Sequence, residues 1–129
     1  MDETLNLTET KGCHCLAARK RARELTRLYE EKLRPFGLRA TQFSILAALG
    51  IKGPTPVGDL ADILGLERTT LTRSASVLER DGRIATAPAE DGRQRLWRLT
   101  AKGRNTLESA LPAWREAQRE VEGDGEGHS

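Results

Sequence analysis

The residues best suited to chemistry lie near the start of the chain, where two cysteines flank a histidine in Cys13-His14-Cys15. Within a helix, residues two apart point about 200° away from each other, so these thiols cannot share a metal ion unless the helix unwinds. Structural zinc needs four ligands, and the only other histidine, His128, lies near the opposite end of the chain. We therefore expect no metal site.

Nothing else in the sequence is arranged for catalysis. There is no Ser-His-Asp set, no phosphate-binding loop and no paired metal ligands, and two histidines near the chain ends cannot serve a central cleft. We expect a protein that is not an enzyme and that uses no cofactor.

The length and composition favour a single soluble domain. A chain of 129 residues holds one modest hydrophobic core. No apolar run approaches the roughly 20 residues that span a bilayer, and residues 1–12 are too polar for a signal peptide. We expect a cytoplasmic protein without a membrane partner, whose Cys13 and Cys15 are thiols because cytosolic disulfides are rare.

Charge is distributed unevenly, although the formal net charge is only +2. Residues 64–104 contain nine arginines and lysines against five acidic residues, while residues 105–129 contain two against six. This pattern is typical of a phosphate-contacting segment in a nearly neutral chain, and an ordinary solvated surface can also produce it. The basic middle segment is therefore the candidate region for a nucleic-acid contact.

Apolar periodicity and chain breakers predict five helices. The expected ranges are 13–33, 40–49, 56–63, 67–80 and 100–121. Gly50, Gly53 and Pro54 are expected to break the second helix after Leu49. Thr55 is expected to cap the third helix, with Pro56 in its first position, and Thr100 is expected to cap the last.

A β-hairpin is expected between the fourth and fifth helices. Two short strand-like runs, 83–88 and 94–99, flank a polar loop that contains an Asp-Gly pair. The fold class is thus mainly α with a two-stranded hairpin. Residues 13–121 form the domain, between a flexible N-terminal arm (residues 1–12) and a glycine-rich, disordered tail (residues 122–129).

The stretch from Pro56 to Arg80 predicts a helix–turn–helix. Such a motif needs a small residue where the helices cross, a glycine in the turn and an aliphatic anchor on the second helix. Ala61, Gly65 and Leu71 stand at those places, although any helical hairpin with a glycine turn would show the same three residues. The residues expected to fill the shared core are Leu60, Ile63, Leu64 and Leu78.

The second helix of this motif begins with two arginines and three threonines. The N-terminal turns of a recognition helix meet base edges in the major groove, where threonine contacts bases or phosphates and arginine forks onto guanine. The hairpin that follows has two arginines near its tip, which makes it a candidate wing. The expected DNA contacts in these elements are Arg68, Thr69, Thr70, Thr72, Arg73, Arg93 and Arg95.

Several motifs, in order, resemble the MarR family of winged helix–turn–helix regulators. Residues 91–93 (Asp-Gly-Arg) and 99–103 (Leu-Thr-Ala-Lys-Gly) are similar to the wing signature of the family, residues 38–46 to its second helix, and residues 78–82 to the end of its recognition helix. The resemblance covers about residues 13–121. It implies a regulator, expected to be a repressor, that binds a pseudo-palindromic operator in double-stranded DNA. Arg93 would then enter the minor groove, and Asp91 would orient basic side chains of the wing or helix.

The resemblance also implies a homodimer built from the first and last helices, and it places small-molecule effectors between the dimerisation and DNA-binding regions. Family members usually continue into a long final helix, so the dimer interface here is expected to be reduced or built differently, with a monomer as the alternative. Arg39 stands where many members have a capping Thr or Ser. The expected interface residues are Ala18, Ala22, Leu25, Tyr29, Leu107, Leu111 and Trp114.

A cysteine-based peroxide sensor is one alternative to a plain operator-binding regulator. In the branch of the family that senses organic hydroperoxides, a reactive cysteine opens the first helix, and Cys15, Thr26 and Tyr29 resemble its spacing. Arg19 and the helix N-terminus would favour the thiolate, although that branch has a tyrosine in place of Arg19. We expect a buried, inert thiol at Cys15, with Cys13 as the second redox candidate.

The other alternative is a protein-interaction module that has kept the winged fold without binding an operator. Such a module would be expected to lose the base-facing hydroxyl groups and the wing arginines, and this chain retains both.

Overall fold

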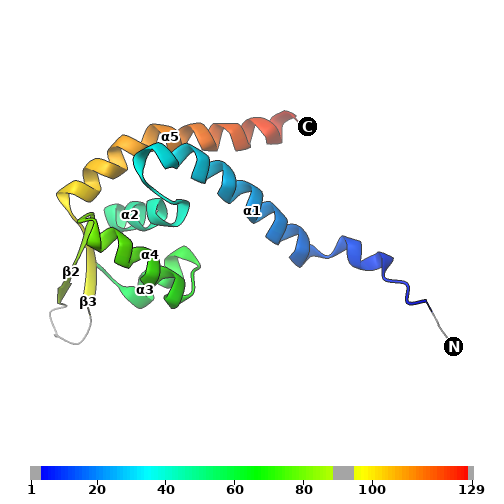
Figure 1. The fold of residues 1–129 in the computed structure, drawn as a ribbon, viewed down its shortest axis with the longest axis horizontal. Coiled ribbons are helices and arrows are strands. Elements are labelled where there is room, and N and C mark those ends of the chain that lie inside the picture. The colour runs from blue at the N-terminus through cyan, green and yellow to red at the C-terminus, as the bar shows by residue number, and fades with distance from the viewer. Residues whose placement is uncertain (1–3, 89–94, 128–129) are drawn as a thin grey trace.

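The computed structural model of the chain describes residues 4–88 and 95–127. Those residues form a mainly helical fold with a small sheet (Figure 1). No described helix combines the length and apolar character that a membrane span requires. The elements are α1 (His14–Leu33), α2 (Ala40–Lys52), β1 (Thr55–Pro56), α3 (Val57–Leu64), α4 (Arg68–Arg80), β2 (Ile84–Pro88), β3 (Arg95–Leu99) and α5 (Ala101–Gly127), with 3-10 helices at Thr8–Gly12 and Arg34–Phe36.

The helices form two parts that meet at α2. On one side of α2 lie α3, α4 and the sheet, and on the other side α1 and α5 pack together (Figure 1). The N-terminal half of α1 extends away from this body, and every residue from His14 to Glu24 is exposed. The arm before it, predicted to be flexible, contains the 3-10 helix Thr8–Gly12.

The core is centred on α2, whose Ile45, Leu46 and Leu49 are buried against α3, α4 and α5. The prediction that Ile63 belongs to this core is wrong, since its side chain is 45% exposed. Ile63 lies at the rim of the core, where its side chain borders an open hollow together with Ile51 and Lys52 of α2. The largest fully buried side chains are those of Leu33, Ile45, Leu46, Leu49, Leu60, Leu71, Leu78 and Ile84.

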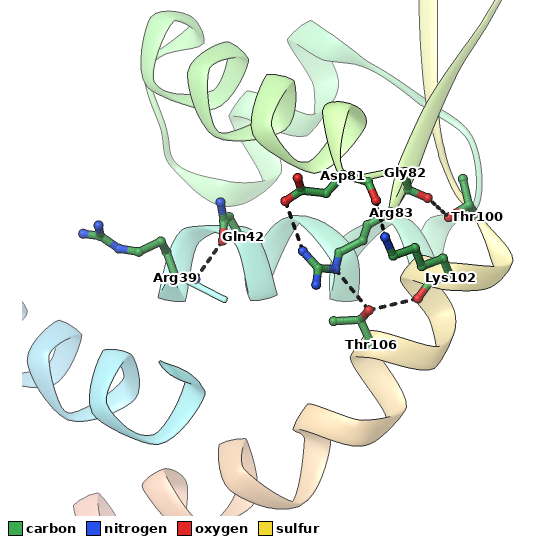
Figure 2. Close-up of polar contacts among 8 residues, drawn as sticks. All are labelled: Arg39, Gln42, Asp81, Gly82, Arg83, Thr100, Lys102 and Thr106. Carbon is green, nitrogen blue, oxygen red and sulfur yellow. Dashed lines mark hydrogen bonds and ion pairs between the residues drawn. The ribbon is translucent and has the colours of Figure 1, made fainter. Parts of the chain in front are cut away.

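The start of α2 is capped from another helix. Its N-cap residue, Arg39, offers no oxygen acceptor, and its backbone N–H donates instead to Gln42 Oε1 at 2.8 Å (Figure 2). Glu30 of α1 accepts the Ala40 N–H at 2.8 Å and pairs with Arg39 Nε at 2.8 Å. Because a carboxylate also interacts favourably with the positive end of the helix dipole, Glu30 replaces the capping Ser or Thr and joins α1 to α2.

The sheet has three strands where the sequence predicted two. Its order is β1-β3-β2, all antiparallel, with Thr55 opposite Trp97 and Pro56 opposite Leu96. The prediction that Thr55 caps α3 is wrong. Its hydroxyl donates to the Gly53 carbonyl at 2.8 Å, and Pro56, in an extended conformation, is the N-cap residue.

Two helices, α2 and α5, extend further toward their C-terminal ends than the sequence analysis predicted from their glycines. Helix α2 passes through Gly50 and ends at Gly53, whose positive φ of 79° turns the chain. A Cβ on Gly50 would lie 3.5 Å from Leu107 Cδ2, in ordinary van der Waals contact with α5. Helix α5 continues to Gly127 instead of ending near Val121. No proline follows Pro112, so nothing in that stretch interrupts the backbone hydrogen bonds of the helix.

A network of polar contacts connects the end of α4 with the start of α5 (Figure 2). Thr100 Oγ1 donates to the Gly82 carbonyl at 2.7 Å and accepts the Gly103 N–H at 3.0 Å, which confirms it as the cap of α5. Lys102 Nζ donates to the Asp81 carbonyl at 2.6 Å, and Arg83 reaches both Asp81 and Thr106. These contacts fix the exit of α4, and hence the wing, to the first turns of α5.

Gly103 allows the closest backbone approach in this network. It is buried, and a Cβ at this position would overlap the carbonyl oxygen of Arg83 and lie 2.9 Å from Leu99 Cδ1. A glycine inside a helix ordinarily lowers its stability. Here the glycine is required, because any side chain would push α5 away from the start of β2.

We predict that Gly103→Ala lowers the free energy of unfolding by about 2 kcal/mol, since overpacking outweighs the helix propensity gained. Chemical denaturation measures this change. Gly123→Ala is the matched control: Gly123 also lies in α5, but nothing surrounds its Cβ position within 4 Å. The control should be as stable as the parent or slightly more so. Equal stability of Gly103→Ala and the parent would contradict the close approach.

Candidate nucleic-acid interface

The helix–turn–helix predicted from Ala61, Gly65 and Leu71 is present in α3 and α4. Ala61 and Leu71 are buried where the two helices pack together. Gly65 ends α3 in the left-handed conformation, with φ 64°, and the Leu66 N–H then donates to the Ala61 carbonyl at 3.0 Å. A residue without Cβ adopts this conformation with little strain, so the glycine sets the angle between α3 and α4.

Helix α4 has one buried face and one exposed face. Leu71, Ala75 and Leu78 recur at helical spacing and are buried against α2 and α3. The five polar residues predicted to contact DNA all lie on the exposed side of its N-terminal turns. These residues are Arg68, Thr69, Thr70, Thr72 and Arg73.

The hairpin after α4 forms the wing, and Trp97 anchors it. The Trp97 side chain is 7% exposed, and its residue pairs with both Thr55 of β1 and Thr86 of β2. Arg95 is exposed at the start of β3, opposite Pro88. Asp91 and Arg93, the two wing residues that the family resemblance singled out, lie outside the described residues.

The two cysteines are placed differently from the prediction. Cys13 is the N-cap residue of α1 and Cys15 lies in its first turn, and both are exposed in the single chain, so the expected burial of Cys15 is wrong. The Arg19 guanidinium lies one turn further along, with Nη2 3.7 Å from Cys15 Sγ. Among the described residues, every residue of this half of α1, from His14 to Glu24, is exposed.

The C-terminal half of α1 is fastened to α5 by polar contacts. Lys32 Nζ lies 2.9 Å from both Glu116 Oε1 and Glu120 Oε1. Hydrogen bonds to these carboxylates raise the pKa of Lys32 above its ordinary value, and the bond from Lys32 lowers the pKa of Glu116. The Tyr29 hydroxyl donates to Gln118 Oε1, and partial burial is the main cause that raises the pKa of Tyr29.

The residues predicted to form a dimer interface divide between exposed and half-buried positions. Ala18 and Ala22 are exposed on the free half of α1. The other five, namely Leu25, Tyr29, Leu107, Leu111 and Trp114, are half-buried. Leu107, Leu111 and Trp114 border an apolar hollow of about 390 Å³ between α5 and α2, next to the exposed Ile51.

Comparisons with known proteins agree on one family. The model of the MarR family matches residues 36–94. The crystal structure of the transcriptional regulator MosR from M. tuberculosis is 40% identical, with a TM-score of 0.81 over 89% of this chain and 84% of MosR. A structure of MosR in complex with DNA is 44% identical, with a TM-score of 0.77 over 84% of this chain and 80% of that one.

Two curated relatives are also transcriptional regulators. The HTH-type transcriptional regulator YwoH of Bacillus subtilis (strain 168) is 33% identical over 87 residues, which are 67% of this chain. The transcriptional activatory protein BadR of Rhodopseudomonas palustris is 40% identical over 93 residues, which are 68% of this chain. The matched region spans 64% of the length of YwoH and 53% of the length of BadR.

Proposed function

The chain belongs to the MarR family of transcriptional regulators, and we propose that it binds a pseudo-palindromic operator in double-stranded DNA as a homodimer. The observation that carries this proposal is the exposure of the arginine and threonine side chains on the first turns of α4, the helix that leads into the wing. The 44% identity to MosR, whose structure was determined in complex with DNA, supports it.

The chemistry of α4 suits the major groove. Threonine hydroxyls contact bases or phosphates, and an arginine forks onto O6 and N7 of guanine. Leu71 and Leu78 hold the helix by its buried face, so the exposed side chains on its first turns meet DNA without rearrangement of the core. Arg93, which lies between the two wing strands in the sequence, would reach the adjacent minor groove, and Asp91 would orient it.

A homodimer gives such a protein two recognition helices for two half-sites one helical turn apart. The exposed half of α1 provides a surface for the second copy, with Ala18 and Ala22 allowing close helix packing. Repression follows where the bound dimer competes with RNA polymerase for the promoter. A small-molecule effector would bind in the apolar hollow between α2 and α5, whose volume suits a ligand of modest size.

Catalysis forms no part of this proposal. The relatives are transcription regulators, and the exposed polar groups of α4 and the wing are those expected of a DNA contact. The alternative hypothesis is a protein-interaction module that does not bind an operator. Under that hypothesis, a selection of bound DNA should recover no preferred sequence, whereas the proposal predicts one.

A second candidate function, oxidant sensing, is favoured by the contact between Arg19 and the exposed Cys15. The Cys15 thiolate would attack an organic hydroperoxide, forming a sulfur–oxygen bond as the O–O bond breaks. The sulfur is oxidised to sulfenic acid, and the leaving alkoxide takes up a proton to become an alcohol. The thiol of Cys13 of the partner subunit could then attack the sulfenic sulfur, forming a disulfide as the S–O bond breaks and water leaves. Either the sulfenic acid or the disulfide would tilt one DNA-binding lobe against the other and weaken operator binding.

The first prediction concerns base contact. Thr70→Ala and Arg73→Ala should each weaken operator binding by about 1–3 kcal/mol and reduce sequence preference. Arg80→Ala, two turns further along α4, is the charge-matched control and should keep that preference. Arg93→Ala should weaken binding to all sequences and flatten its salt dependence. Fluorescence anisotropy on an operator selected from genomic DNA measures these effects, and a Thr70/Arg73/Arg93 triple variant with parental binding would refute the interface.

The second prediction concerns assembly. Ala22→Asp should give monomers that still fold, because residue 22 is exposed in the single chain while an unpaired charge cannot be buried against a second copy. Ala101→Asp, at another exposed helical alanine, should remain dimeric. Sedimentation velocity at micromolar concentration distinguishes these outcomes. A monomeric parent protein, or a dimeric Ala22→Asp, would contradict the proposed interface.

The third prediction concerns the thiols. Titration of cumene hydroperoxide into the protein–operator complex should release DNA from the parent protein and not from Cys15→Ser. If the hydroperoxide also releases DNA from the Cys13→Ser variant, Cys15 acts alone as the sensor. If DNA stays bound to Cys13→Ser, the response requires a disulfide between the two cysteines. Unchanged DNA affinity of the fully oxidised parent protein would leave both thiols without a sensing role.

A further inference from the structure

A hollow of about 230 Å³ lies beside the first turn of α4. It is bordered by the segment from the end of β1 into α3, by α4 and by β3, so three parts of the DNA-binding region meet there. Half of its lining residues, namely Asp59, Arg68 and Arg95, are charged, so the hollow can hold an ionic group. The lining residues are Pro56, Val57, Gly58, Asp59, Arg68 and Arg95.

Gly58 gives the Arg68 side chain its place in this hollow. A Cβ on Gly58 would lie 2.5 Å from Arg68 Nη2 and 3.5 Å from Arg68 Cζ, so the guanidinium rests against the bare backbone of α3. The backbone of Gly58 itself needs no positive φ. An alanine at this position would therefore leave α3 intact and displace the guanidinium, because the end of a long side chain moves more easily than a helix.

The charges around the hollow leave it positive. Arg68 comes from α4 and Arg95 from the wing, and neither forms an ion pair within residues 4–88 and 95–127. Asp59 alone is acidic among the lining residues. Two guanidinium groups against one carboxylate attract an oxyanion, and arginine binds phosphate through paired N–H donors.

We propose that this hollow holds one backbone phosphate of the bound DNA, and that Gly58 is the positioning residue that keeps Arg68 directed at it. The proposal rests on the proposed DNA-binding function and assigns Arg68 to phosphate contact instead of base reading. A DNA phosphodiester is the occupant that fits, because the hollow is bordered by both Arg68 of α4 and Arg95 of the wing, the two elements that the proposed function places on the same duplex. Asp59 also borders the hollow, and repulsion between its carboxylate and the phosphate would limit the affinity for DNA of any sequence.

The test measures binding of the full chain to a fluorescent duplex of scrambled sequence over a series of salt concentrations. Arg68→Ala removes one phosphate contact and should reduce the slope of log K against log salt by about 0.9. Gly58→Ala should reproduce most of that loss. Gly123→Ala, with open space around its Cβ position, should change nothing. Asp59→Asn should bind the scrambled duplex more tightly than the parent protein.

A double-mutant cycle separates positioning from a merely structural effect. Because Gly58 acts through Arg68, the Gly58→Ala/Arg68→Ala double variant should bind no more weakly than Arg68→Ala. Additive losses, or a parental salt slope for Gly58→Ala with unchanged thermal stability, would overturn the proposal. The ratio of operator to scrambled-duplex affinity should stay constant in Arg68→Ala, and a fall in that ratio would make Arg68 a base reader. A parent protein that binds no duplex would refute the proposed function itself.

Discussion

The constraint on which the rest of the structure depends is the close approach of α5 to the carbonyl of Arg83, which only a glycine at position 103 allows. At this one point the exit of the recognition helix, the first wing strand and the first turn of α5 come together (Figure 2). Arg83, Thr100 and Lys102 then connect these three segments by hydrogen bonds. Because α5 continues as a single helix to Gly127, the orientation of the DNA-binding lobe is tied to the far end of the molecule through rigid backbone.

The other long helix, α1, is held in a different way, and the difference matters for assembly. Its C-terminal half is attached to α5 through Lys32 and Tyr29 and to α2 through Glu30. In its N-terminal half, every residue from His14 to Glu24 is exposed in the described chain. Because a helix is stiff, a displacement at the exposed N-terminal end of α1 would also move its C-terminal half, which is attached to α2 and α5. In a dimer, contacts along that free half would therefore set the distance between the two α4 helices, and the cysteines lie at its tip.

Local signals in the sequence predicted much of this fold, and non-local packing accounts for what they missed. The turn glycine Gly65 and the cap Thr100 were identified correctly because their chemistry acts within four residues. Strand β1 was missed because two residues show no periodicity, and its pairing depends on Trp97, more than forty positions away. Glu30 was missed as a cap for the same reason. Gly50 was taken for a helix breaker because the breaker rule considers only local propensity and not the packing of α2 against α3, α4 and α5. Of the candidate site, sequence alone found the exposed arginines and threonines of α4, but not the hollow beside Gly58, which exists only once α3 and β3 are in place.

A nearly neutral chain can still approach DNA in one orientation, because its charges are separated along the molecule. The basic segment, residues 64–104, holds nine positive residues against five negative ones, and it contains α4 and the described wing strands. The acidic segment, residues 105–129, lies mostly in α5, whose C-terminal end points away from the wing (Figure 1). Part of this acidic charge is neutralised by Lys32, which pairs with Glu116 and Glu120.

Since exposed charges are screened over about 8 Å at physiological salt, phosphates near the wing respond to the local basic surface and not to the net charge of +2. The separation thus orients the protein on DNA before any specific contact forms.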